Sequence, residues 1–374
     1  MLGFAIASLC GSLTKAFRLT NHTLHVTQGN TVQTPGMFRR YRKPIVNAMR
    51  SYLSMDDISV YDKLRYYMGW VDIDGTPCVA VEGKALRPTL CLFACKATGG
   101  NIKEAIPAAV ALEFLHNFSL IHDDIQDCDE TRHHRPTMWK VWGIPKALVA
   151  GNILRIIADR CLEDLVDKEG IKKGQAIYVM GLLTEAYLEM IEGQYLDLWY
   201  EGRPDIKIAD YLKMISHKTG ALIRCALNLG ASIGTCNTET VEAFRSFGKS
   251  LGYIFQIRDD MLGVWGDESA TGKPVGADVR RKKNSLPVVY AMSHTEGEDN
   301  RLLMEIYSQE GLLNDRNVSV VLDLMDGINT REYAQNLAEK YGNRAIEAIS
   351  GIGLPPKIIQ EAEELIEFLL LREH

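Results

Sequence analysis

The sequence predicts an all-α protein folded as one large helical bundle, and three observations support this prediction. Apolar residues recur at helical spacing, as at Ala108, Ala111, Leu112 and Leu115. Proline is sparse, with 12 residues in 374, and clusters near the ends of the apolar segments. No segment shows sustained alternation of apolar and polar residues closed by a two-residue turn, which is the pattern of a β-hairpin.

The first part of the chain differs from the rest. Residues 20–34 are rich in Thr, Asn, Gln and His and show little apolar periodicity. We therefore interpret residues 1–38 as a poorly ordered leader. Helical patterns dominate afterwards, so we expect a single domain over residues 39–374.

Two further segments predict long helices. The stretch from Ile177 to Leu198 contains no proline and carries apolar residues at helical spacing. Residues 358–369 repeat the pattern, with glutamates between the apolar positions, which indicates an amphipathic helix near the C-terminus.

Composition excludes several classes of protein. Lys and Arg number 42 against 48 Asp and Glu, a net charge of −6, so we expect no nucleic-acid partner. The eight cysteines form no CxxC pair, which argues against a disulfide framework or a zinc site and favours a cytoplasmic location. No run of about 18 apolar residues is free of charge, so we expect no transmembrane segment.

An acidic cluster follows an apolar helical run at residues 114–121. Asp123, Asp124 and Asp127 form a DDxxD pattern, and on a helix Asp123 and Asp127 lie on one face. Like charges at this spacing repel by roughly 0.2–0.5 kcal/mol. Mg²⁺ would relieve the repulsion, because it prefers carboxylate oxygens and is often shared with substrate phosphates. The alternative is a solvated acidic helix end.

A second acidic pair, Asp259 and Asp260, ends another apolar helical run at residues 251–257. Helical bundles build metal sites from side chains on facing helices. We therefore expect the two acidic groups to face each other and to hold a diphosphate through divalent cations.

Basic residues that would bind this anion are spread along the chain. Lys84 and Arg87 are three residues apart and can converge on one phosphate, although a plain surface pair is the alternative. Arg132 follows the first acidic cluster; alternatively, Arg132 and Arg135 pair with Asp129 and Glu130.

Three lysines further along the chain are also candidates for binding the diphosphate. Lys218 precedes an expected helical kink at Gly220, from which it can reach inward. Lys273 lies on a loop that lacks the P-loop pattern. Lys283 ends a run of four basic residues that would otherwise be a solvated patch.

Six motifs, taken in order along the chain, resemble those of the trans-isoprenyl diphosphate synthases. They are GKxxRP, HxxxxxHDDxxD, RxxRPT, KTG, QxxDD and GKxxGxD…KxSLP. The resemblance covers residues 40–374 and is closest to the short-chain geranylgeranyl diphosphate synthases. It implies an isoprenoid synthase fold, a bundle of mostly antiparallel helices around a deep central cavity, in a homodimer. It also implies head-to-tail condensation of isopentenyl diphosphate with an allylic diphosphate.

The resemblance assigns roles residue by residue. The Mg²⁺ ligands, for three ions with bound diphosphate, would be Asp123, Asp124, Asp127, Asp259 and Asp260. Isopentenyl diphosphate would contact Lys84, Arg87, His116 and His133. The allylic substrate would contact Arg132, Lys218, Thr219, Gln256, Lys273 and Lys283.

Three positions depart from the family pattern. Ala85 replaces an arginine of the first basic motif, and His133 replaces the second of two adjacent arginines. A neutral imidazole lacks the fixed charge and the bidentate fork of arginine, which weakens the expected contact with isopentenyl diphosphate. Gly263 stands where the second motif commonly has a third aspartate.

The expected chemistry follows from charge placement. Metal ions and cationic side chains stabilise the departing diphosphate, and the apolar cavity protects the allylic carbocation from water. Lys218 and Thr219 would also steady the cation, the latter through its carbonyl dipole. The isopentenyl double bond then attacks, and a diphosphate oxygen takes the proton.

Residues about one turn before Asp123 would form the floor of the product cavity. These are Phe118 and Ser119. An aromatic residue followed by a small one resembles the geranylgeranyl (C20) synthases, because Ser119 leaves room where a second ring would close the cavity. Phe118 could instead be an ordinary core residue, which would leave chain length set elsewhere.

Two other functions fit the same scaffold. A terpene cyclase would ionise a prenyl diphosphate without consuming isopentenyl diphosphate, and the departures at Ala85 and His133 are compatible with it. A non-catalytic subunit of a heteromeric synthase would be expected to lose one aspartate motif, whereas both aspartate pairs are present here.

Overall fold

A computed structural model describes residues 33–54, 58–78, 83–166, 168–268 and 274–373. Residues Thr34–His374 form one compact unit. Its first helix begins at Gly36, inside the last residues of the predicted leader, and Met37 and Phe38 are buried. Residues 1–32 lie outside the described residues, so the leader and the domain division stay predictions.

Most of the described residues are helical. The helices are α1 (Gly36–Leu53), α2 (Val60–Tyr67), α3 (Leu86–Ala97), α4 (Ile102–Gln126), α5 (Met138–Trp142), α6 (Ile144–Glu163), α7 (Lys173–Tyr200), α8 (Ile208–Lys218), α9 (Gly220–Gly234), α10 (Thr238–Trp265), α12 (Ala277–Arg280), α13 (Leu286–His294), α14 (Gly297–Ser308), α15 (Asp315–Gly327), α16 (Thr330–Ser350) and α17 (Pro356–Leu371). Two short antiparallel strands, β1 (Thr131–Arg132) and β2 (Arg135–Pro136), form the one sheet of the described residues.

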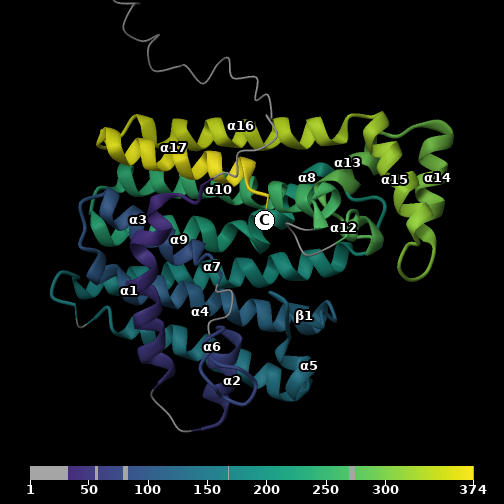
Figure 1. Cartoon of the computed structure of the whole chain (residues 1–374). Helices are drawn as coiled ribbons and strands as arrows, with labels where there is room; N and C mark the ends of the chain where they lie inside the picture. The colour runs from purple at the N-terminus through teal and green to yellow at the C-terminus, as the bar shows by residue number, and fades with distance from the viewer. Residues whose placement is uncertain (1–32, 55–57, 79–82, 167, 269–273, 374) are drawn as a thin grey trace, which may run out of the picture. The chain divides into compact units, whose positions relative to one another are not determined.

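The long helices lie side by side in rows. Figure 1 shows α16, α10, α9, α7, α4 and α6 following one another from the top of the view to the bottom. Helix α10 packs on both α9 and α16, and α4 packs on α6 and α3. Short connections between successive long helices make neighbours run antiparallel, as in other helical bundles.

Helix α4 is central to the bundle and ends at the first acidic cluster. Its N-terminus is capped by Asn101, whose side chain accepts a hydrogen bond from the amide of Lys103. Its length and hydropathy would suffice to cross a membrane, but 61% of its most apolar window is buried inside the protein. Helix α4 therefore reads as the core helix of the bundle.

A smaller apolar core joins the C-terminal part of α10 to α12–α15. Its buried residues include Val264 on α10, Val279 on α12 and Val321 on α15. This core matters for the site, because it fixes the short helix α12 against the end of α10.

The predicted helices are confirmed. Residues 177–198 lie within α7, and residues 358–369 lie within α17. The kink predicted at Gly220 is also present, since α8 ends at Lys218 and α9 begins at Gly220. The fold class predicted from periodicity is therefore correct.

Candidate active site

The first acidic cluster ends α4, with most of its carboxylate surface turned away from solvent. Asp124 is 1% exposed; its Oδ1 accepts a hydrogen bond from Nε of Arg132 at 2.7 Å, whereas its Oδ2 has no partner within the described part of the chain. Burial raises the pKa of Asp123 and of Asp124 to about 6. Burial thus disfavours the charged form of both carboxylates despite the nearby Arg132 and Lys218, and a bound cation would offset this cost.

The β1–β2 hairpin positions Arg132. The turn between the strands consists of His133 and His134, both with positive φ, as a tight two-residue hairpin requires. Helix α2 holds the second strand, because the Arg135 guanidinium lies 4.0 Å from the centre of the Tyr66 ring and donates to the Tyr66 carbonyl oxygen.

The alternative pairing of these arginines with Asp129 and Glu130 is wrong. Arg132 pairs with Asp124. Asp129 instead pairs with Arg281, and Glu130 with Lys140. Arg132 is thus tied to the first acidic cluster and not to the acidic residues that follow it.

Lys218 links the first acidic cluster to α7. Its Nζ donates to Oδ2 of Asp197 at 2.5 Å. Burial alone would lower the pKa of Lys218, but Asp197, Asp123 and Asp127 together raise it above its usual value. The ends of α4, α7 and α8 therefore converge on one charged cluster.

A chain of hydrogen bonds leads from Thr219 to the second acidic pair. The Thr219 hydroxyl donates to Oε1 of Gln256 at 2.5 Å, and Nε2 of Gln256 donates to Oδ1 of Asp260 at 2.8 Å. Because Thr219 directly follows Lys218, this chain joins the two acidic groups across α8 and α10. The sequence-based expectation that both groups share one region is consistent with this geometry.

Asp260 and Asp259 have different surroundings. Asp260 is 6% exposed, and its Oδ2 also accepts hydrogen bonds from the Tyr211 hydroxyl at 2.6 Å and the Leu286 amide at 2.7 Å. Burial raises the pKa of Asp260 to about 7. Asp259 is more exposed and pairs with Arg372 at 3.0 Å.

The basic run at 280–283 is not a solvated patch. Arg280 pairs with Asp315, Arg281 pairs with Asp129, and Lys282 donates to a backbone carbonyl oxygen. For Lys283, loss of water contacts would lower the pKa, but Asp278 and Asp127 raise it above its usual value. Lys283 therefore lies near Asp127 of the first acidic cluster, and its contact with the allylic substrate stays a prediction.

Arg87 and His116 lie in a buried region next to this cluster. Arg87 is 8% exposed, its Nε has no hydrogen-bond partner among the described residues, and burial lowers its pKa to about 10. Glu113, one turn before His116, is the nearest opposing charge. Burial lowers the pKa of His116 well below its usual value, so the imidazole is neutral.

The remaining predicted contacts are less enclosed. Lys84 and His133 are exposed as whole residues, but protein atoms partly enclose the ends of their side chains, and Lys84 Nζ lies 5.3 Å from the centre of the Phe368 ring on α17. Lys273 lies outside the described residues.

The predicted cavity floor is built from aromatic side chains. Phe118 is 7% exposed and lies edge-on to Tyr187 of α7, with ring centres 5.7 Å apart. His122 packs against the other side, at 4.6 Å. Ser119 is partly buried, and its hydroxyl donates to the His116 carbonyl oxygen.

Comparison with known proteins decides the family. The polyprenyl synthetase family model matches residues 76–347. The chain belongs to the polyprenyl synthetase family. It is 35% identical over 310 residues to the (2E,6E)-farnesyl diphosphate synthase of Mycobacterium tuberculosis, spanning 82% of this chain and 85% of that one. It is 37% identical over 296 residues to the geranylfarnesyl diphosphate synthase of Aeropyrum pernix, spanning 78% and 90%.

A solved structure agrees with this assignment. The geranylgeranyl pyrophosphate synthetase from Pyrococcus horikoshii Ot3 superimposes with a TM-score of 0.79 at 33% identity, covering 90% of this chain and 98% of that one. The chain thus has the isoprenoid synthase fold and is a trans-prenyltransferase. Because the relatives make products of different length, their names leave the product length of this polyprenyl synthetase open.

Sequence reasoning missed several residues of this polyprenyl synthetase site. Asp197 and Tyr211 contact predicted site residues: Asp197 accepts a hydrogen bond from Lys218, and Tyr211 donates one to Asp260. Asp197 was detectable, because it ends a long apolar helix as the two acidic groups do. No pattern in the sequence marks Arg372 as a site residue, because only the fold brings the C-terminal end of α17 to Asp259.

The carboxylates of the polyprenyl synthetase site fit a hard divalent cation. Asp123, Asp127 and Asp197 all lie near Lys218, and Oδ2 of Asp124 has no partner within the described chain. No group of three or more His, Cys, Asp or Glu in the described residues is close enough to hold an ion alone. A cation would therefore complete its shell with water and diphosphate oxygens, as Mg²⁺ commonly does.

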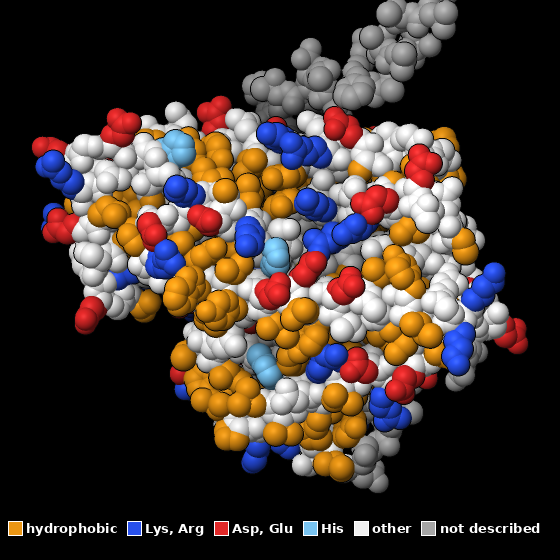
Figure 2. Space-filling model, turned by 180° about the vertical axis from the view of Figure 1, so that it is seen from behind, with side chains coloured by type: hydrophobic (Ala, Val, Ile, Leu, Met, Phe, Trp, Pro, Cys, Tyr) orange, Lys and Arg blue, Asp and Glu red, His pale blue; other side chains and the backbone are white. Residues whose placement is uncertain are grey.

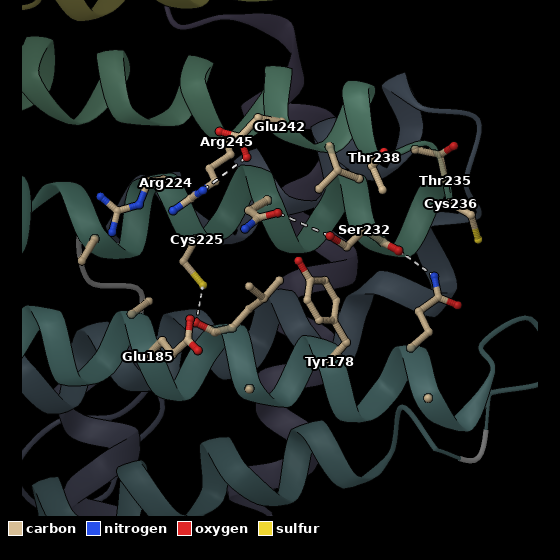
Figure 3. Close-up of a pocket in the computed structure, with 18 of the residues that line it drawn as sticks. Tyr178, Glu185, Arg224, Cys225, Ser232, Thr235, Cys236, Thr238, Glu242 and Arg245 are labelled. Atoms are coloured by element: carbon tan, nitrogen blue, oxygen red, sulfur yellow. Dashed lines mark hydrogen bonds and ion pairs between the residues drawn. The ribbon is translucent and has the colours of Figure 1, made fainter.

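One groove in the described part of the chain lies away from these residues. It has a volume of about 870 Å³ and runs between α7, α9 and the start of α10. Figure 3 shows charged residues at its edge, where Arg224 pairs with Glu189 and Arg245 with Glu242. No predicted site residue lines it, so the charged cluster at the ends of the helices, and not this groove, is the candidate active site of the polyprenyl synthetase.

Proposed function

We propose that the protein is a Mg²⁺-dependent synthase that condenses isopentenyl diphosphate head-to-tail with dimethylallyl, geranyl or farnesyl diphosphate, giving geranylgeranyl diphosphate. One observation carries the proposal: Lys218 lies near Asp123 and Asp127 of the first acidic group, and the next residue, Thr219, is joined through Gln256 to Asp260 of the second. The site therefore gathers cationic and carboxylate groups where a metal-bound diphosphate would lie.

The allylic diphosphate would bind in this cluster. Lys218, Lys283 and Arg132 supply positive charge, while Thr219 and Gln256 supply hydrogen-bonding groups. Figure 2 shows acidic and basic side chains side by side across the middle of one face, with hydrophobic side chains around them. Lys273 stays a predicted contact.

Isopentenyl diphosphate would bind beside it, at Lys84, Arg87 and His116. Arg87 is buried with an unsatisfied Nε, which is costly unless an anion approaches. His133 lies in the hairpin turn, and burial together with the Arg132 charge lowers the pKa of its imidazole. It therefore contributes a neutral contact where an arginine would be charged.

The Mg²⁺ ligands would be Asp123, Asp124, Asp127, Asp259 and Asp260, for three ions. When bound, the ions neutralise the departing diphosphate and so favour its ionisation. The protein holds the leaving group through Lys218 and Lys283 and surrounds the allylic chain with apolar side chains that exclude water. Thr219 lies at the break between α8 and α9, and its backbone carbonyl dipole would face the carbocation.

Product length would be set by Phe118 and Ser119. Phe118 packs against Tyr187 and His122, so its ring closes the space one turn before Asp123. Ser119 is small, so it would leave space beside this ring for the growing chain. This arrangement supports a C20 product.

We also propose a homodimer in a reducing, cytoplasmic compartment. Large apolar side chains are exposed along one side of α6 and α7: Ile144, Leu148, Val149, Ile156, Ile177, Tyr178, Leu188, Ile191, Tyr195, Leu198 and Trp199. A second copy of the chain would bury this surface. The described cysteines are free thiols, which supports a reducing location.

One incubation tests the activity. Purified protein is mixed with Mg²⁺ and labelled isopentenyl diphosphate, and separately with C5, C10, C15 and C20 allylic diphosphates; products are resolved by chain length. We expect C20 diphosphate, formed only when isopentenyl diphosphate is present. Hydrocarbon released from the C20 substrate alone would instead indicate a terpene cyclase, and no turnover with any substrate would indicate a non-catalytic subunit.

A further inference from the structure

Gly263, which follows the second acidic pair on α10, lies unusually close to the side chain of Asp278. A Cβ atom placed on Gly263 would lie 2.0 Å from Oδ2 of Asp278 and 2.5 Å from its Cγ. These distances are far below van der Waals contact. The Asp278 carboxylate therefore occupies the space into which a side chain at position 263 would extend.

Helix α12 holds Asp278 in this position. Val279, its neighbour, is fully buried in the apolar core that also contains Val264 of α10. The Gly276 amide donates to the Val264 carbonyl oxygen at 2.9 Å, which ties the start of α12 to the last turns of α10. Arg280 binds the Leu313 carbonyl oxygen from the opposite side of the helix. Backbone and core thus fix the approach of Asp278 to Gly263.

Asp278 also lies beside Lys283. The Lys283 amide donates to the Asp278 carbonyl oxygen at 3.0 Å. The Asp278 carboxylate is one of the charges that raise the pKa of Lys283, and Asp127 of the first acidic cluster is another. Asp278 is therefore next both to the turn of α10 that follows Asp260 and to Lys283.

The neighbouring carboxylates are already engaged. Both oxygens of Asp260 accept hydrogen bonds, three in all, and Asp259 pairs with Arg372. With glycine at 263, the second pair by itself would offer little carboxylate oxygen to a metal-bound diphosphate.

We propose that Asp278 supplies the third carboxylate of the second acidic group and binds the metal–diphosphate complex from the place a side chain at 263 would fill. This inference rests on the proposed function, since its ligand is Mg²⁺ with a diphosphate. The metal-binding carboxylates of the second group would then come from two helices. Gly263 on α10 leaves the room, and Asp278 on α12 supplies the carboxylate that occupies it.

The test measures binding of Mg²⁺ with inorganic pyrophosphate by isothermal titration calorimetry. Asp278→Asn preserves shape but removes the charge. The double variant Gly263→Asp with Asp278→Ala moves the carboxylate to α10 and vacates the space it needs. Asp315→Asn is the matched control, because Asp315 also contacts α12, through Arg280, but on the side away from the site. Thermal unfolding without Mg²⁺ confirms that each variant is folded.

We expect Asp278→Asn to weaken Mg²⁺–pyrophosphate binding by about 10- to 100-fold, a range typical of lost metal-site contacts. The double variant should recover most of this loss, and Asp315→Asn should bind like the wild type. Wild-type binding by Asp278→Asn would overturn the inference, as would a double variant that folds but binds no better than Asp278→Asn.

The synthase assay is run on the wild type in parallel. Product formed by the wild type, together with unaltered binding by Asp278→Asn, would reject the role of Asp278 and leave the proposed function standing. Absence of product from the wild type would reject the function, and the pyrophosphate titration would still decide whether Asp278 binds the complex.

Discussion

Lys84 shows how the surroundings of one side chain tune the site. Its amine lies near the Phe368 ring, and partial burial together with the neighbouring Arg372 charge lowers its pKa to about 8. Arg372 in turn pairs with Asp259, so the C-terminal end of α17 connects Lys84 to the second acidic pair. The charge of Lys84 therefore depends on pH close to the physiological range.

The pKa of Lys84 predicts a pH dependence for isopentenyl diphosphate binding. Lys84 is cationic below pH 8 and becomes neutral above it, so the KM for this substrate should rise as pH increases through 8. Lys84→Arg should flatten the rise, because a guanidinium stays protonated there. Steady-state kinetics from pH 7 to 9.5 give the measurement. Equal slopes for the two proteins would rule out Lys84 as the titrating group.

Phe118 tests the assignment of the cavity floor. Phe118→Ala should lengthen the product beyond that of the wild type, because it removes the ring that closes the space beside Tyr187. Truncating a buried phenylalanine also costs about 3–5 kcal/mol of stability. Products are therefore compared by chain length at a temperature where the variant is folded.

Phe247→Ala is the matched control for Phe118→Ala. Phe247 is fully buried on α10, packed edge-on against Phe244. It should lose comparable stability without altering product length. An unchanged product distribution in Phe118→Ala would show that chain length is set elsewhere.

Single residues were predictable where they repeat a local pattern. Asp123 and Asp127 could be assigned from their spacing and Lys218 from its place before the kink at Gly220, and the three residues lie near one another. The pairing of Arg132 was not predictable, because Asp129 is nearer to it in sequence than Asp124, and only the hairpin turn directs Arg132 back to Asp124. Arg372 and Asp278 act through space, and local sequence does not reveal that.

Between elements, the contact of α7 with α8 sets the position of Lys218. A Cβ atom on Gly193 would lie 2.0 Å from the Lys218 amide nitrogen and 2.5 Å from its Cα. The two helices can approach this closely only because residue 193 has no side chain. The approach also allows Asp197, one turn later on α7, to pair with the Lys218 amine.

Gly193→Ala should therefore damage both stability and catalysis. Overpacking of this kind costs about 1–3 kcal/mol, and the displaced Lys218 should lower kcat. Gly174→Ala, in the first turn of the same helix, meets no atom within 4 Å and should leave both unchanged. Denaturant unfolding and turnover are measured for each. Equal behaviour of the two variants would refute the close-contact argument.

The sequence predicts which segments are helical, but it does not predict which of these helices pack against each other. The 3.6-residue period marked α4, α7 and α17, because each buries one side or all of its surface. The contact between α2 and the β1–β2 hairpin joins residues about 70 positions apart. Such long-range packing depends on shape complementarity, which periodicity does not encode.

At the scale of the whole molecule, the exposed apolar side of α6 and α7 is the feature left to explain. Along α7, Leu188, Ile191, Tyr195 and Leu198 follow a spacing of three and four residues, which places them in one stripe. A helix near a two-fold axis pairs with its own copy, so a single apolar stripe suffices for a symmetric interface. Solvated alone, this surface would favour aggregation.

The stripe predicts that charge on α7 converts a dimer to a monomer. Wild-type protein should elute with light scattering at about twice the mass of one chain, and Leu188→Glu with Ile191→Glu at the mass of one chain. Two buried carboxylates facing two others across the axis would be too costly to desolvate. Leu312→Glu is the control, since Leu312 is 71% exposed outside this stripe and should leave the mass unchanged. A wild type that elutes as a monomer, or a double variant that stays a dimer, would exclude this surface as the interface.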